Sequence, residues 1–240
     1  MKKSYRIRLK ITVLAAAVFL VLAMTMYREG PTVQEAAAPK ASLTQEKLQP
    51  AGNTEKPPVA ALTFDDGPSG EYTEKLLDGL KKRNVKASFF LLGKCLEGNE
   101  KLVQRMQKEG HLIGNHTYNH VQLNKVSDAR AREEILRTNN RIYEITGEYP
   151  VYMRPPYGAW NKEMELCVEM LPVMWSIDTL DWKTRNTQSI LQIVQKNVKN
   201  GSIILMHDEY ETTVQAALEI VDTLKKQGYE FVTVDRLILP

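Results

Sequence analysis

Two adjacent carboxylates end an apolar run in the sequence Thr63-Phe64-Asp65-Asp66-Gly67-Pro68-Ser69. The run that begins at Val59 has the composition of a buried strand, and the Gly-Pro pair after the acids marks a turn. The strand is therefore expected to stop with Asp65 and Asp66 at its tip. Like charges this close oppose each other's ionisation, so we expect a cation to neutralise one acid while the other transfers protons.

The rest of the chain from Val59 repeats the order strand, then helix. The strands are predicted at Val59–Phe64, Ala87–Leu92, Leu112–Asn115, Val151–Arg154, Val173–Ile177, Ser202–Met206 and Phe231–Val234. The helices are predicted at Thr73–Arg83, Asn99–Glu109, Ser127–Thr146, Thr187–Val198 and Val214–Gln227. Seven strands that alternate with helices favour a parallel, barrel-like α/β fold.

A metal site for the paired acids is suggested by His116-Thr117-Tyr118-Asn119-His120. If this segment turns as a helix, both imidazoles face the same point. Taken alone, Asp-Asp-Gly-Pro also fits a solvated turn, and His-x-x-x-His on a helix is commonly accidental. Each of the two strings needs support from the rest of the chain.

Three further strings supply that support, namely Arg154-Pro155-Pro156-Tyr157-Gly158, Asp178-Thr179-Leu180-Asp181-Trp182 and Leu205-Met206-His207-Asp208. Their polar residues fall at or just after the ends of predicted strands, the face where α/β barrels gather catalytic side chains. In this order, the five strings resemble the five motifs of the polysaccharide deacetylases, the NodB-like group of carbohydrate esterase family four. The resemblance covers about residues 59 to 234 and implies a distorted (β/α)7 barrel.

The resemblance implies that Asp66, His116 and His120 bind one divalent metal, and the residue types agree. Two nitrogens and one carboxylate oxygen leave a coordination position open for water, as in catalytic rather than structural zinc sites. Zn²⁺ is the expected ion, and Co²⁺, Ni²⁺ or Fe²⁺ suit the same ligands.

The resemblance also assigns the proton transfers. Asp65 is the expected general base, held in place and kept ionised by a fork of hydrogen bonds from Arg154, and His207, oriented by Asp181, is the expected general acid. Arg154 would otherwise read as a structural ion-pair partner and His207 as a core histidine. The positions that match substrate-binding residues are Trp182 and Leu205, around the acetyl methyl, and Tyr157, whose backbone N–H helps hold the oxyanion. Asp178 matches the first acid of its motif without a clear duty.

The front of the chain differs from the rest in charge. Nine basic and four acidic residues give 1–58 a net charge of +5, and because the whole chain carries +3, residues 59–240 carry −2. Basic residues precede the uncharged stretch 11–27, which predicts an uncleaved membrane anchor over 1–28 with its N-terminus in the cytoplasm. The Pro- and Ala-rich segment 29–58 is expected to be a flexible stalk, and 59–240 the catalytic domain.

These features predict a single-pass protein of a bacterial cell membrane whose catalytic domain is extracellular. We expect it to remove N-acetyl groups from N-acetylglucosamine residues of a glycan, with peptidoglycan preferred. The alternatives are a chitooligosaccharide or O-acetyl-xylan deacetylase, a cyclic-amide hydrolase with a closed pocket, and a catalytically silent glycan-binding module. We expect the protein to be a monomer. We do not expect it to bind nucleic acid, because the residues that make the pI basic lie in the front segment.

Three smaller features complete the sequence predictions. His111 is expected to be structural. Cys95 and Cys167 are expected to be buried thiols, with a disulfide as the alternative. The charged residues of Asp128–Arg141 are expected to form a solvated helix face.

Overall fold

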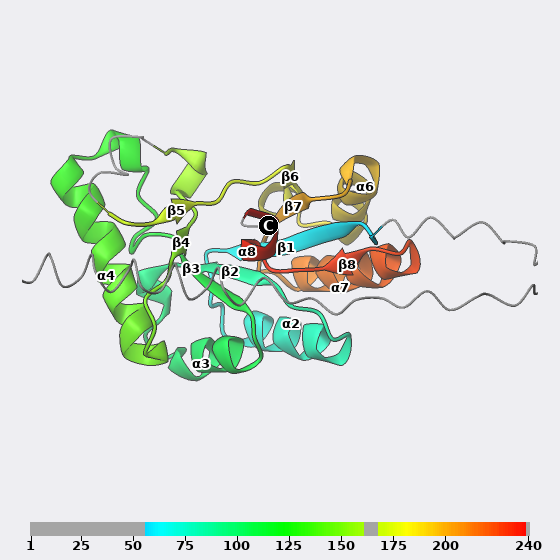
Figure 1. Ribbon diagram of the computed structural model, residues 1–240, viewed down its shortest axis with the longest axis horizontal. Coiled ribbons are helices and arrows are strands. Elements are labelled where there is room, and N and C mark those ends of the chain that lie inside the picture. Colours follow the sequence, from blue (N-terminus) through cyan, green and yellow to red (C-terminus); the bar gives the residue numbers. More distant parts are fainter. Residues whose placement is uncertain (1–55, 161–167, 239–240) are drawn as a thin grey trace, which may run out of the picture. The chain divides into compact units, whose positions relative to one another are not determined.

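Strand β1 (Val59–Asp65) lies inside a parallel sheet, between β2 and β7 (Figure 1). The computed structural model describes residues 56–160 and 168–238. Six of the seven β1 residues are buried, as expected for a parallel strand that is covered on both faces. This double burial explains why the sequence of β1 is a continuous apolar run.

All strand pairings of this sheet are parallel, in the order β5-β4-β3-β2-β1-β7-β6. The other strands are β2 (Ser88–Leu91), β3 (Leu112–Asn115), β4 (Tyr152–Met153), β5 (Leu171–Pro172), β6 (Ile177–Asp178), β7 (Ser202–His207) and β8 (Glu230–Phe231). β8 pairs with β1 at Val59 and Ala60, whereas β2 pairs with β1 from Thr63 to Asp65. The beginning and the end of β1 therefore have different neighbours on that side.

The barrel predicted from the sequence is found in a coarser form, as a curled sheet with two edges. No pairing among the described residues joins the edge strands β5 and β6. The predicted strand Val173–Ile177 does not form as one unit, because the segment from β5 to β6 runs from one edge to the other. The Val173 N–H donates to Met153 O at 2.8 Å, and the Ser176 N–H donates to Ile203 O at 2.9 Å. The alternation of strand and helix breaks at this segment.

The five predicted helices are present, and their ends agree with the prediction within three residues. They are α2 (Glu71–Lys82), α3 (Glu100–Lys108), α4 (Asp128–Thr146), α6 (Thr187–Asn197) and α7 (Glu211–Lys226). The Ser127 hydroxyl accepts the Arg130 N–H at the start of α4, and Gly147, with φ 76°, ends it. Short helices that were not predicted are η1 (Gly93–Cys95), η2 (Leu123–Lys125), η3 (Pro156–Gly158), α5 (Asp181–Thr184) and α8 (Asp235–Ile238).

The main hydrophobic core lies between the sheet and helices α2, α3, α6 and α7. Leu76 and Leu80 of α2 and Ile220 of α7 are buried there, and the Phe64 and Phe89 rings stack with centroids 5.3 Å apart. A smaller cluster joins α4 to the sheet at β4. This packing holds the parallel strands in register, so their carboxyl ends meet at one edge of the sheet.

Several sequence predictions concern residues outside or at the margin of the described part. The predicted anchor and most of the predicted stalk lie outside it. Within 56–160 and 168–238, no helix has both the length and the apolar character that a membrane span requires. Cys95 is half-buried rather than buried, and Cys167 lies outside the described residues. His111 is buried, and its Nδ1 accepts the Ala87 N–H at 3.1 Å, in keeping with a structural role.

Candidate active site

The two adjacent acids at the end of β1 turn toward different partners. Asp65 is the last strand residue, and its Oδ1 accepts a hydrogen bond from Arg154 Nη1 at 2.8 Å. Asp66 has φ 71°, in the left-handed region that aspartate adopts more readily than most residues. Its Oδ1 lies 3.4 Å from His116 Nε2 and 3.5 Å from His120 Nε2. One carboxylate is thus paired with a cation, and the other faces two imidazoles.

The donor atoms of Asp66, His116 and His120 lie within 4.8 Å of one another. Two ligands of a tetrahedral zinc ion, each at its usual bond length, are about 3.4 Å apart, which matches the two measured separations. Asp66 Oδ1 is buried and accepts no hydrogen bond from any described residue. The geometry and the unshared lone pairs of this oxygen therefore fit a divalent metal.

The protonation of His116 also suits a metal ligand. Its Nδ1 lies 2.6 Å from the carbonyl oxygen of Arg154, and if Nδ1–H donates there, the Nε2 lone pair points toward Asp66. Burial lowers the pKa of His116 to about 3, so the ring is neutral at pH 7. Fixing the tautomer through the far nitrogen is how proteins orient a metal-binding imidazole.

The segment His116–His120 does not turn as a helix, the condition under which spacing alone would align the two imidazoles; it is a loop. Thr117 and His120 have φ values of 67° and 60°, which no helix permits. The Asn115 side chain accepts the Thr117 N–H at 2.6 Å and so shapes the turn directly after β3. The two imidazoles approach Asp66 because of this folded loop, and helical periodicity plays no part.

The far side of the same loop is held by Glu134 of α4. Its Oε2 accepts the backbone N–H groups of Tyr118 at 3.0 Å and Asn119 at 2.6 Å. Arg130 pairs with its Oε1 at 2.5 Å. The expectation of a solvated helix face was wrong for Glu134, because its side chain is buried and acts as the anchor of the histidine loop.

Arg154 is fully buried beneath Asp65. Nη1 bonds both Asp65 and Thr63 Oγ1, whereas Nε and Nη2 donate to the carbonyls of Val173 and Met174 at 3.1 and 3.3 Å. The predicted fork onto Asp65 is therefore a single contact. Burial raises the pKa of Asp65, and the positive charge of Arg154 opposes that rise. Asp65 Oδ2 makes no hydrogen bond to a described residue and is 3.7 Å from His116 Nε2, so it faces the site.

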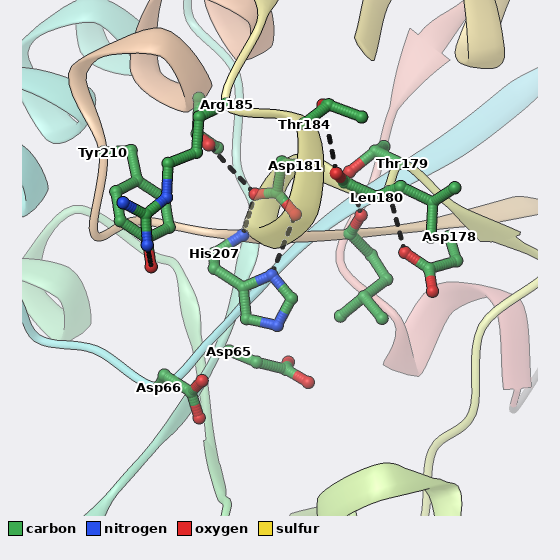
Figure 2. Close-up of polar contacts among 12 residues, drawn as sticks. Asp65, Asp66, Asp178, Thr179, Leu180, Asp181, Thr184, Arg185, His207 and Tyr210 are labelled. Carbon is green, nitrogen blue, oxygen red and sulfur yellow. Dashed lines mark hydrogen bonds and ion pairs between the residues drawn. The ribbon is translucent and has the colours of Figure 1, made fainter. Parts of the chain in front are cut away.

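His207 lines the same pocket as His116 and His120, and Figure 2 shows its ring between Asp181 and the acids Asp65 and Asp66. Asp181 is buried; its Oδ1 is 2.9 Å from His207 Nδ1, and its Oδ2 accepts the His207 N–H at 2.7 Å and the Thr213 hydroxyl at 3.0 Å. Burial disfavours the imidazolium, but Asp181, with smaller contributions from Asp65 and Asp66, outweighs it and raises the pKa of His207 to about 9.

A pocket of about 420 Å³ opens over these groups. It is lined by Asp65, Asp66, His116, His120, Pro155, Tyr157, Trp175, Asp178, Trp182, Leu205 and His207. The Tyr157 ring meets the His120 ring edge-on at 4.7 Å, and no hydrogen bond among the described residues uses the Tyr157 N–H. Every residue predicted for metal binding, catalysis or substrate binding lines this pocket except Arg154 and Asp181, which lie behind it.

Asp178 receives a local role from the structure. Its Oδ1 accepts the Leu180 N–H at 2.9 Å, which stabilises the turn that leads into α5. Leu180 has φ 55°, so this turn needs such support.

Sequence reasoning missed several residues of the site. Thr63 stands in the opening motif, and its alternation with Asp65 along the strand was a usable signal that both face Arg154. Trp175 lines the pocket and lies 5.7 Å from the Arg154 guanidinium, but it belongs to no motif string. Thr213 and Glu134 act from helices distant in sequence, and no local pattern marks them.

The fold and the site define a curled parallel α/β domain with a candidate catalytic metal centre. A family model described as polysaccharide deacetylase matches residues 52–175. The chain belongs to this family.

Three relatives show how far the similarity extends. The peptidoglycan-N-acetylglucosamine deacetylase PgdA of Listeria monocytogenes is 45% identical over 74% of this chain and 38% of its own length. A Bacillus cereus protein with the name peptidoglycan-N-acetylglucosamine deacetylase is 37% identical over 82% of this chain and 98% of its own length. The structure of the Bacillus subtilis peptidoglycan deacetylase PdaC has a TM-score of 0.74 at 41% identity, and the match covers 75% of this chain and 90% of that one. The chain spans only about 38% of the full PgdA sequence.

Proposed function

We propose that this protein is a metal-dependent deacetylase that removes the acetyl group from N-acetylglucosamine residues of peptidoglycan. One observation carries the proposal. A carboxylate held by an arginine and an imidazole held by a carboxylate flank a set of three metal-ligand atoms inside one pocket. The names of the relatives supply the substrate class, since both PgdA and the Bacillus cereus protein are named for peptidoglycan N-acetylglucosamine.

Asp66, His116 and His120 would hold the metal, with zinc as the expected ion. A bound divalent cation supplies Lewis acidity, which polarises a carbonyl and makes water acidic enough to attack near neutral pH. The open side of the three donors faces the pocket, where the acetamide carbonyl would lie. Cobalt, nickel and iron remain alternatives because the same donors accept them.

Asp65 would take the proton of the attacking water through Oδ2, since Oδ1 is occupied by Arg154. A carboxylate whose pKa is raised by burial is a stronger base than an exposed one, which suits this role. Arg154 keeps the group oriented through Nη1 and through its bonds to two backbone carbonyls.

His207 would donate a proton to the departing amine nitrogen. With a pKa of about 9, it is protonated at neutral pH, and its Nδ1 contact to Asp181 leaves Nε2 directed at the pocket. The Tyr157 N–H is available to the oxygen that gains negative charge, and Leu205, Trp175 and Trp182 give an apolar wall for the acetyl methyl.

The experiment that tests the proposal incubates purified protein with N-acetylglucosamine oligomers, muropeptides and acetylated xylan and follows acetyl loss by mass spectrometry. Loss from muropeptides is the expected result, and preferential loss from chitooligosaccharides or xylan would favour those alternatives. A cyclic-amide hydrolase would act on none of the glycans. A silent glycan-binding module would bind muropeptides without changing their mass.

We further propose that residues 1–28 anchor the protein in the cell membrane, that 29–58 form a stalk, and that the monomeric catalytic domain acts outside the cell. The support is the basic flank before the uncharged stretch 11–27. A tether of this kind would keep the domain close to the wall polymer.

A further inference from the structure

Asp208 is a buried acid that the proposed chemistry does not use. It follows His207 directly, its side chain is fully buried, and its Oδ1 has no hydrogen-bond partner among the described residues. Its Oδ2 accepts a hydrogen bond from the Thr73 hydroxyl of α2. Burial raises the pKa of this carboxyl to about 7. A buried carboxyl with so few partners is costly, which calls for a reason for its presence.

The Asp208 carboxyl lies directly against Gly67, the residue after the metal ligand Asp66. A Cβ atom added at Gly67 would be 2.5 Å from Asp208 Oδ1 and 2.8 Å from Oδ2. Gly67 does not have a positive φ, so glycine is required there for space and not for its backbone freedom. The residue after β7 therefore packs against the turn after β1.

Two further contacts hold the same turn. The Thr73 hydroxyl that donates to Asp208 also accepts the Ser69 N–H at 2.7 Å. On the other side, the Leu92 N–H donates to Gly67 O at 3.1 Å. The turn is fixed on one side by Asp208 and Thr73 and on the other by the end of β2.

Asp66 needs this support because the groups that face its Oδ1, the imidazoles of His116 and His120, are themselves proposed metal ligands. It adopts φ 71°, and its Oδ1 accepts no hydrogen bond from the described residues. The direction of the carboxylate is thus set by the backbone on either side. We propose that Asp208 is a positioning residue that presses on Gly67 and thereby keeps Asp66 aimed at the metal; this inference rests on the proposed Asp66, His116 and His120 site.

The test measures zinc affinity by chelator competition on folded apo-protein, together with the apo melting temperature. Gly67→Ala places a methyl group into the Asp208 carboxyl and should weaken zinc binding about 10–100-fold, the usual effect of misplacing a group that orients a ligand. Asp208→Ala should weaken it as well. The double variant should bind zinc about tenfold more tightly than Gly67→Ala alone, because the new methyl then fills the vacated space.

Thr73→Val removes the hydroxyl at nearly constant volume and provides a second route if Asp208→Ala fails to fold. It should lower zinc affinity without a matching fall in the melting temperature of the apo-protein. Thr73→Ser should restore the affinity. Asp222→Ala, which removes an exposed acid of α7 that pairs with Arg83, is the matched control and should bind zinc as the wild type does.

The outcomes separate this inference from the proposed function. A wild type that binds no divalent metal refutes the metal site itself. A wild type that binds zinc, with Gly67→Ala at the same affinity or with a double variant no better than Gly67→Ala, overturns the role of Asp208 and leaves the metal site standing.

Discussion

Replacing Asp181 with asparagine should move the alkaline limit of activity. Asp181 contributes both the hydrogen bond and the nearby negative charge that raise the pKa of His207 from 6.5 to about 9. That rise corresponds to about 3.4 kcal/mol of stabilisation of the imidazolium. Without the charge, the burial of His207 acts almost alone, so in Asp181→Asn the pKa should fall to 6.5 or lower.

The change in protonation gives the size of the effect. At pH 8 the protonated fraction of His207 should drop from about 90% to about 3%, a loss of about 30-fold in the form able to donate a proton. The assay is the pH dependence of the initial rate of N-acetylglucosamine deacetylation. The wild type should lose activity as the pH rises through about 9. In Asp181→Asn the same loss on raising the pH should already occur below pH 7.

Two comparisons make the reasoning refutable. Asp222→Asn, an exposed change on α7, should keep the wild-type profile. On an acetyl ester with a good leaving group, the Asp181→Asn deficit should shrink, because that alcohol departs without a proton. An alkaline limit that stays near pH 9 in Asp181→Asn, or an equal deficit on ester and amide, would show that His207 is not the proton donor.

The same pKa shift predicts a trend in stability. Because the folded pKa of His207 lies above the unfolded one, its contribution is fully present below pH 6.5 and is lost as the pH rises through about 9. Urea unfolding should therefore find the gap between wild type and Asp181→Asn widest near pH 6 and narrower above pH 9. A gap that does not change with pH would contradict this.

Three further predictions test other parts of the site and of the chain. Asp65→Asn should retain its metal while turnover falls by about 10²–10⁴-fold. His120→Ala should lose both metal and activity. Loss of metal from Asp65→Asn, measured by elemental analysis, would contradict these roles. Glu134→Gln should weaken zinc binding about tenfold or more, because the histidine loop loses the anionic acceptor of two backbone N–H groups; unchanged affinity by chelator competition would contradict this. Full-length protein expressed in bacteria should sediment with membranes and keep its N-terminus, and a secreted species beginning near Ala38 would refute the anchor.

The fold could be predicted from sequence wherever apolar residues recur with one regular spacing over a long segment. Helices such as α4 can be recognised in the sequence by an apolar stripe, a serine at the start and a glycine at the end. The predicted strand Val173–Ile177 was wrong as a unit because two-residue strands carry no periodicity. Which edge each of its ends joins depends on Met153 and Ile203, which lie far away in sequence.

Sequence motifs predicted the residues that line the candidate site, but not the residues that hold them in position. Motif strings located Asp66, His116 and His120, residue chemistry then predicted a set of metal donors, and the structure brings their donor atoms within 4.8 Å of one another. The sequence suggested a helix for the histidine loop, because spacing is all that a sequence shows of two ligands. The loop is instead shaped by Asn115 and by Glu134, a residue whose charged helix neighbours made it look solvated.

The pair Asp65-Asp66 shows why those supports decide the chemistry. Two neighbouring carboxylates can contact different partners only if the chain turns between them. The positive φ of Asp66 provides that turn. Arg154, from the end of β4, takes Asp65 on one side. Asp208, from the end of β7, closes against Gly67 on the other. The proposed division of roles between base and metal ligand therefore depends on three strand ends that lie together, and the two acids alone do not reveal it.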